Sequence, residues 1–271
     1  MRRRFKDFSL ELDLLRDSFI AAPREEQRQW LVDQAVQELV EQLHHLDVIA
    51  PGLIPGKNRT EIHGAWATAE PCVENGSLLV EGQQVMQDWE RPLMQRLAQV
   101  VASSHGDVLE IGFGLGISAG LIEDVGVRSH TIVELNTAVA KTAERWRSER
   151  AASKIEILMG SWEDVVPTLE GFDGILWDAF PTTEAEFAQT VIHDGAVAER
   201  FFAEAARHLN PGGVFAYYSN ERDSLSRRHQ RSLLRYFEAF SVEPVRGLKP
   251  PRDCEYWWAD EMVVVSATTR G

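Results

Sequence analysis

Cysteines and basic residues are scarce in this sequence. Its 271 residues include only Cys72 and Cys254, which have no metal-ligand spacing and suggest no disulfide framework, so we expect a reducing compartment, the cytoplasm, and no metal. Lysine and arginine number 28 against 42 acidic residues, a formal net charge of −14. A nucleic-acid-binding protein needs a basic face, so we expect no nucleic-acid partner. Acids such as Asp7 and Glu11 interrupt the segment after the basic residues 2–4, and we predict neither a leader nor a membrane span.

The glycine turn at residues 112–116 lacks a feature of dinucleotide sites. The run Val108-Leu-Glu-Ile-Gly-Phe-Gly-Leu-Gly116 reads as a buried strand that ends in an acid and opens through a glycine turn into a helix. A dinucleotide site requires a glycine three places after Gly114, and position 117 is Ile. Glu110 disfavours phosphates and suits a cationic ligand. The pattern acid-x-Gly-x-Gly-x-Gly is typical of S-adenosyl-L-methionine (SAM) methyltransferases, and an ordinary strand-to-helix turn is the alternative.

Of four successive predicted strands, the first, second and fourth end in an acid: Glu110, Glu134 and Asp178. The carboxyl ends of parallel strands share one crevice, so these carboxylates should lie close together. Glu134, at the end of the second strand, can accept both ribose hydroxyls of an adenosine. Trp162 and Glu163 or Asp164, after the third strand, can meet the adenine; a structural tryptophan and a helix-capping acid are the alternative.

Two parts of the chain are predicted. Residues 1–60 form a helical extension with an amphipathic helix at 23–46, which docks on the second part or, alternatively, forms a homodimer. Residues 61–271 alternate helical segments, such as 93–101 and 197–209, with strands, such as 214–218 and 262–267, and a tight turn is expected at 210–213. This alternation predicts an α/β fold with a doubly wound, mainly parallel sheet.

Several longer motifs resemble the guanidinoacetate N-methyltransferase family. They are Val85-Met-Gln-Asp-Trp-Glu-Arg-Pro-Leu-Met94, Glu110-Ile-Gly-Phe-Gly114, Trp162-Glu-Asp-Val165, Phe172-Asp-Gly-Ile-Leu-Trp-Asp178, Leu209-Asn-Pro-Gly-Gly-Val214 and Pro250-Pro-Arg-Asp-Cys-Glu-Tyr256. The resemblance spans residues 62 to 271 and implies a class I SAM-methyltransferase (Rossmann-like) fold. Glycine loops and Pro-Gly-Gly turns are common to many methyltransferases; the Trp-Glu and Pro-Pro-x-Asp-Cys elements are more specific.

By position, the resemblance implies that Glu90 and Asp178 are the two substrate carboxylates. Carboxylates receive the parallel N–H pairs of a guanidinium as bidentate, charge-assisted hydrogen bonds. We expect Asp178 to accept the proton as the N–C bond forms and Glu90 to hold the group. A strand-end cap and a solvated helix acid are the alternatives for these two residues.

The resemblance also implies a set of cofactor residues for SAM. We assign Glu110, Gly112 and Gly114 to the methionine end, Glu134 to the ribose, and Trp162 with Glu163 to the adenine. Met94 matches a family methionine near the cofactor, with a core methionine as the alternative. Trp66 corresponds to a tryptophan that closes the family's site, or belongs to a lid held by ordinary packing.

The segment 218–224 departs from the family. Here Asn220, Glu221 and Arg222 stand where the family has a small polar loop. Glu221 suits an α-ammonium and Arg222 a carboxylate, which favours a small cationic guanidino substrate with an amino-acid head, L-arginine; a solvated charged loop is the alternative.

Other functions remain open from the sequence. They are methylation of guanidinoacetate to creatine, protein arginine methylation, an aminopropyltransferase, an NAD-dependent oxidoreductase, and a non-catalytic SAM-binding protein acting through its N-terminal helix.

Overall fold

The computed structural model describes residues 64–150, 154–187, 197–219, 221, 225–257 and 259–270. The chain divides into two units, Met1–Lys57 and Asn58–Gly271. The predicted helix at 23–46, and with it the proposed dimer contact, lies outside the described residues.

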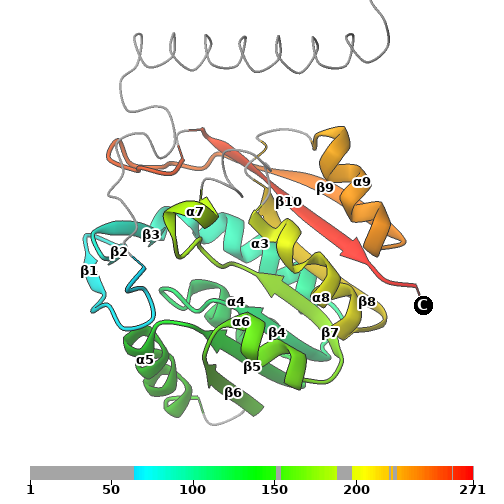
Figure 1. Cartoon of the computed structure of the whole chain (residues 1–271), viewed down its shortest axis with the longest axis horizontal. Coiled ribbons are helices and arrows are strands. Elements are labelled where there is room, and N and C mark those ends of the chain that lie inside the picture. The colour runs from blue at the N-terminus through cyan, green and yellow to red at the C-terminus, as the bar shows by residue number, and fades with distance from the viewer. Residues whose placement is uncertain are drawn as a thin grey trace, which may run out of the picture. The chain divides into compact units, whose positions relative to one another are not determined.

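A seven-stranded sheet organises the second unit (Figure 1), in the order β6-β5-β4-β7-β8-β10-β9. Its strands are β4 (Asp107–Ile111), β5 (Ser129–Glu134), β6 (Lys154–Met159), β7 (Phe172–Trp177), β8 (Leu209–Ser219), β9 (Ala239–Arg246) and β10 (Glu261–Thr268). β4 to β8 are mutually parallel, and β10 runs antiparallel to both β8 and β9. The predicted mainly parallel sheet is confirmed.

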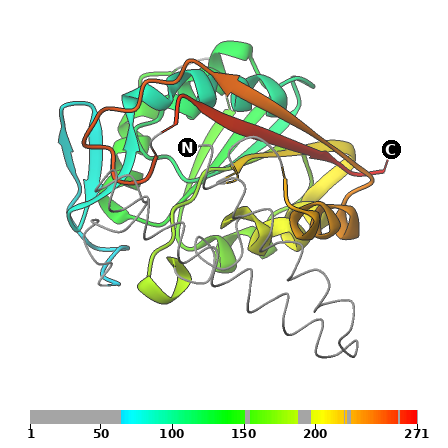
Figure 2. The ribbon, with the colours of Figure 1, turned by 90° about the horizontal axis from the view of Figure 1, so that it is seen from above.

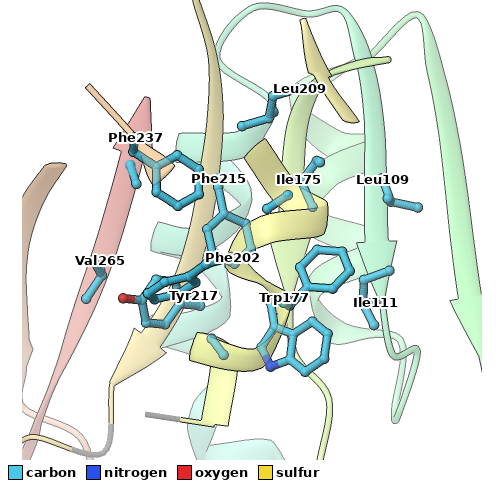
Figure 3. Close-up of a cluster of buried hydrophobic side chains, with 14 of the residues drawn as sticks. Leu109, Ile111, Ile175, Trp177, Phe202, Leu209, Phe215, Tyr217, Phe237 and Val265 are labelled. Carbon is cyan, nitrogen blue, oxygen red and sulfur yellow. The ribbon is translucent and has the colours of Figure 1, made fainter. Parts of the chain in front are cut away.

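Helices connect the strands, and apolar side chains cover both faces of the sheet. The helical elements are α3 (Arg91–Val101), α4 (Ile117–Val125), α5 (Thr137–Ser148), α6 (Trp162–Val165), η2 (Val166–Thr168), α7 (Glu184–Phe187), η4 (Val197–Phe201), α8 (Phe202–His208) and α9 (Arg227–Tyr236). Side chains of a strand alternate between faces. On β8, Phe215 and Tyr217 join Phe202 of α8 in one core (Figure 3), whereas Ala216 joins the core of α3 and α4. The sheet is therefore doubly wound.

A small antiparallel sheet precedes the main one. It comprises β1 (Cys72–Glu74), β2 (Ser77–Val80) and β3 (Gln83–Gln87), and a short 3-10 turn, η1 (Asp88–Glu90), joins it to α3. The sequence motif at 85–94 therefore spans a strand, a turn and a helix start, with Pro92 in the first turn of α3. This small sheet was not predicted.

Two local predictions are corrected by the structure. Residues 210–213, expected as a tight turn before a strand, fall within β8, where Gly212 has φ +76° and the pairing with β7 shifts register between Phe172 and Gly174. The segment expected as a helix at 197–209 starts as the 3-10 helix η4 before α8 begins at Phe202. Among the described residues, no helix is both long and apolar enough to cross a bilayer.

Candidate active site

The glycine turn after β4 is shaped by close backbone contacts. Gly112, Gly114 and Gly116 have φ of +94°, +54° and +70°, a region that favours glycine. A Cβ on Gly112 would lie 2.3 Å from the backbone oxygen of Asp178, and one on Gly114 would lie 2.7 Å from the sulfur of Met86. Neither position has room for a side chain, which explains both glycines and brings β4, β7 and β3 together at one point.

A cavity of about 310 Å³ lies beside this turn. Residues from the ends of β4, β5 and β7 line it, together with residues of the small antiparallel sheet and the segment after β7. The lining includes Trp66, Val80, Met86, Gly112, Gly114, Glu134, Asn136, Trp162, Glu163, Asp178, Phe180, Glu186 and Tyr218. Six of the predicted cofactor residues and Asp178 therefore meet in one place.

Glu134 shapes the cavity floor from the end of β5. One carboxylate oxygen accepts the backbone N–H of Phe113 (2.9 Å) and the other that of Asn136 (2.7 Å). Burial raises the pKa of Glu134, although these backbone bonds lower it. The backbone N–H groups of Gly114 and Leu135 also lower this pKa, so a ribose hydroxyl would share the carboxylate oxygens with backbone donors.

Trp162 and Glu163 stand at another side of the cavity, in the first turn of α6. The Trp162 ring packs edge-on against Trp177 and Phe201, with centroids 5.5 and 5.2 Å apart. Arg200 lies over Trp162, 5.5 Å from the ring centroid, and forms ion pairs with Glu163 (2.9 Å) and with Glu186. Trp162 thus presents a fixed aromatic surface, while Glu163 is exposed and already paired.

Trp66 closes one side of the cavity. Its ring stacks on Phe180, with centroids 5.5 Å apart and planes inclined by 8°. The Asn136 side chain holds the backbone of this segment, because its amide donates to the carbonyls of Trp66 (2.7 Å) and Ala69 (2.8 Å). The segment that carries Trp66 is therefore anchored by Asn136, in the turn that follows β5.

Asp178 lines the cavity, whereas Glu90 is not among its lining residues and is related to Asp178 by charge. Asp178 lines the cavity directly after β7, and its backbone N–H donates to the carbonyl of Ile111. Burial first, and then the charges of Glu90, Glu110 and Glu134, raise the pKa of the Asp178 carboxyl well above its usual value. Glu90 is 3% exposed; burial raises its pKa from 4.5 to about 7, although hydrogen bonds from Tyr256 and Gln87 lower it.

Glu110, predicted for the methionine end of the cofactor, lies elsewhere. Leu109 and Ile111 face the core of α8, so the intervening Glu110 faces α4. There it is fully buried: Ser118 donates to one oxygen, and His130 Nε2 lies 3.0 Å from the other. His130 Nδ1 contacts Glu123 (3.1 Å). Both oxygens of Glu110 thus have protein partners, and it does not line the cavity.

Met94 does not line the cavity. It is 0% exposed in the core formed by α3 and α4. Met86 of the same motif lines the cavity instead, and its sulfur accepts the backbone N–H of Leu115 at 3.3 Å. The family resemblance named Met94, and the place of Met86 beside the turn follows from β3, which was not predicted.

Of the three residues predicted to bind the substrate head group, the structure describes one. Asn220 and Arg222 lie outside the described residues. Glu221 has its carboxylate bound to His229 Nδ1 (2.7 Å) and to the backbone N–H of Ser226 (3.0 Å), so it is held by α9. The cavity residues that were not foreseen for this site include Phe180, Glu186 and Tyr218, of which Tyr218 is the first residue of the segment 218–224 singled out in the sequence. In the described part of the chain, no cluster of histidine, cysteine and acidic side chains is suited to hold a metal.

Comparison with known proteins identifies the family. Residues 57–269 match the sequence model described as guanidinoacetate N-methyltransferase. The chain belongs to this family. Its fold is accordingly the class I SAM-methyltransferase fold, in agreement with the strand order.

Relatives and solved structures are similar over part of their length. A protein arginine N-methyltransferase 2 from Yarrowia lipolytica is 30% identical over 147 residues, which are 50% of this chain and 28% of that protein. Its namesake from Emericella nidulans is 28% identical over 167 residues, 59% of this chain and 38% of the relative. The chain thus spans well under half the length of these relatives. A spermidine synthase from Thermotoga maritima has a TM-score of 0.50 at 18% identity, over 71% of this chain and 64% of that one. This last likeness concerns the fold alone.

SAM is the cofactor that this family membership implies, and the cavity fits it. The side-chain-free turn at Gly112 and Gly114 admits a ligand close to the backbone. Glu134 has acceptor capacity for ribose hydroxyls, and Trp162 offers a ring to the adenine. No lysine or arginine is among the described residues that line the cavity, which suits a sulfonium and an amino group rather than phosphates.

Proposed function

We propose that this protein is a SAM-dependent N-methyltransferase that acts on a guanidino nitrogen of a small molecule, with L-arginine as the favoured substrate. One observation carries the proposal. Asp178 lies at the cavity wall beside the glycine turn, and the buried Glu90, which is outside the lining, acts by its charge on both Asp178 and the lining residue Tyr218. Two coupled carboxylates form an acceptor for a cationic, planar guanidinium.

The pair also supplies the proton chemistry. SAM provides an electrophilic methyl group on a sulfonium. A guanidinium has a pKa above ~12 and is a poor nucleophile while protonated. Asp178, whose pKa is raised well above its usual value, accepts the proton that the nitrogen loses as the N–C bond forms and the S–C bond breaks. Glu90 holds the group in line, and Tyr218, also in the lining, borders the pair.

Three substrates within the guanidino class are candidates. The acidic cavity favours a cationic acceptor, and Arg222 remains a predicted partner for a substrate carboxylate. Glu221 is less suited to an α-ammonium than the sequence suggested, because His229 and Ser226 already engage its carboxylate. Methylation of protein arginine is a second candidate, favoured by the names of the relatives, and guanidinoacetate is a third, favoured by the family.

A product assay separates these candidates. The purified protein is incubated with SAM and, separately, with L-arginine, guanidinoacetate and an arginine-containing peptide, and each product is analysed by mass and by NMR. We expect the gain of a methyl group on L-arginine. Methylation of the peptide or of guanidinoacetate alone would replace the favoured substrate. SAM binding without any turnover would favour the non-catalytic alternative and contradict the proposed activity.

Two further predictions accompany this function. The scarcity of cysteines favours the cytoplasm, and the amphipathic stripe at 23–46 favours either docking or a homodimer. Fractionation of cells tests the first prediction. The mass in solution of the full chain, compared with that of a chain lacking residues 1–57, tests the second.

A further inference from the structure

The carboxylate of Glu90 is engaged on one side only. Its Oε1 accepts the backbone N–H of Gln87 at 2.7 Å and the hydroxyl of Tyr256 at 2.5 Å. No described residue donates a hydrogen bond to Oε2. Tyr256 lies 166 positions along the chain, in the loop between β9 and β10, so a distant segment fixes which oxygen of Glu90 is free.

We propose that Tyr256 is a positioning residue for guanidinium capture: it saturates Oε1 of Glu90 and leaves Oε2 as the single oxygen offered to the acceptor. This inference rests on the proposed function of the site. It implies an asymmetric pair of carboxylates, in which Glu90 accepts one N–H of the guanidinium and Asp178 accepts a parallel pair of N–H groups. The Asp178 carboxylate accepts no hydrogen bond from the described residues.

Independent contacts hold Tyr256 in place. Its ring stacks on Trp89, with centroids 6.0 Å apart and planes inclined by 26°, and the Trp89 indole donates to the Gln87 side chain at 2.7 Å. The loop before β10 runs beside the small antiparallel sheet (Figure 2), where Gln84 of β3 binds it twice. Its amide donates to the carbonyl of Asp253, and its oxygen accepts the N–H of Glu255, both at 2.9 Å.

This arrangement explains why the Glu90 side chain is buried, although a glutamate usually lies on the surface. Glu90 ends η1 and precedes α3, a position that the sequence alone would place on the surface. The two donors on Oε1 compensate part of the desolvation of the carboxylate. The titratable groups that face Glu90 are Asp178, Tyr218, Cys254 and Tyr256; among these, Tyr256 is the one whose hydroxyl donates to it.

Tyr256→Phe tests the proposal, because it removes one hydroxyl and keeps the ring. The hydroxyl lowers the pKa of Glu90, so its loss should raise that pKa further. Loss of one hydrogen bond to a charged carboxylate corresponds to a shift of its pKa by about one pH unit. We expect the acidic limb of kcat/KM for L-arginine to move to higher pH by that amount, and the KM for L-arginine to rise with a smaller change in kcat. NMR titration of ¹³C-carboxyl-labelled glutamate should show the same displacement for Glu90.

Matched variants make the test specific. Tyr236→Phe, on α9 and 37% exposed, should leave the pH profile unchanged. In a Glu90→Gln background, Tyr256→Phe should no longer shift the profile, because the titrating partner is gone. Gln84→Leu leaves Tyr256 intact but releases the loop, and should shift the Glu90 titration in the same direction; it serves if Tyr256→Phe does not fold.

The outcomes separate the two proposals. An unchanged Glu90 titration and an unchanged pH profile in Tyr256→Phe would overturn the positioning role, even if the wild type methylates L-arginine. If the wild type turned over neither L-arginine nor guanidinoacetate, the proposed function would fail, while the NMR titration would still decide whether Tyr256 controls Glu90.

Discussion

Trp66 and Phe180 lie parallel at one side of the cavity, with ring centroids 5.5 Å apart. Trp66 precedes the small antiparallel sheet, whereas Phe180 follows β7 two residues after Asp178. The stack therefore joins the segment that covers the cavity to the strand end that carries the proposed base.

Trp66→Ala should weaken this closure. Removing a stacked aromatic side chain exposes the cavity and loses roughly 1 kcal/mol or more, so we expect the Kd for SAM to rise about tenfold. Calorimetric titration with SAM measures it. Trp66→Phe, which preserves stacking, should recover most of the affinity, and equal weakening by both variants would contradict the role of the stack.

Glu134→Gln should weaken SAM binding more strongly. The glutamine amide would place an N–H₂ group against a backbone N–H of Phe113 or Asn136, and the charge-assisted bond to a ribose hydroxyl would be lost. We expect the Kd for SAM to increase about 10- to 100-fold. Glu156→Gln, on the exposed side of β6, is the control. Wild-type affinity in Glu134→Gln would remove Glu134 from cofactor binding.

Glu90→Gln should stabilise the protein at neutral pH and above. The folded pKa of about 7 lies above the usual 4.5, so the folded state binds more protons than the unfolded state between these values, and its stability falls as pH rises through that range. Above pH 7 the neutral variant avoids a cost of about 1–3 kcal/mol. Chemical denaturation at pH 4 and pH 8 checks this; an equal difference at both pH values would contradict the raised pKa of the buried Glu90 carboxyl.

His130→Asn should destabilise the fold in a pH-dependent manner. Burial lowers the pKa of His130, but its bonds to Glu110 and Glu123 outweigh burial and the net pKa is raised above 6.5. The contribution of the charged imidazole is thus complete below pH 6.5 and is lost as pH rises through the folded pKa. Breaking such a buried network costs about 3–5 kcal/mol. The stability difference from wild type, measured by denaturation, should shrink at alkaline pH; a difference independent of pH would argue for packing alone.

The sequence predicted the elements with strong local signals. The apolar runs ending in Glu110, Glu134 and Asp178 are strands, and the glycine turn has the positive φ values that its composition indicated. The family resemblance alone singled out Glu90, which its position in the sequence would have placed on the surface, and the structure shows it buried.

Long-range relationships decide where the other predicted site residues lie, and a single sequence does not show them. The direction of Glu110 depends on strand alternation and on His130, twenty residues away. The choice between Met94 and Met86 depends on β3, whose pairing with β2 is not visible in a single short apolar segment. The sequence suggested that Glu221 could bind the substrate, because it does not show that His229 of the next helix contacts the Glu221 carboxylate.

Asp178→Asn tests the central claim most directly. The substitution keeps the size of the side chain at the cavity wall and removes its ability to accept a proton. Single-turnover methylation of L-arginine by SAM should fall at least about 100-fold, while the Kd for SAM, measured by calorimetry, should stay near that of the wild type. Methylation at close to the wild-type rate would contradict the assignment of Asp178 as the proton acceptor of this site.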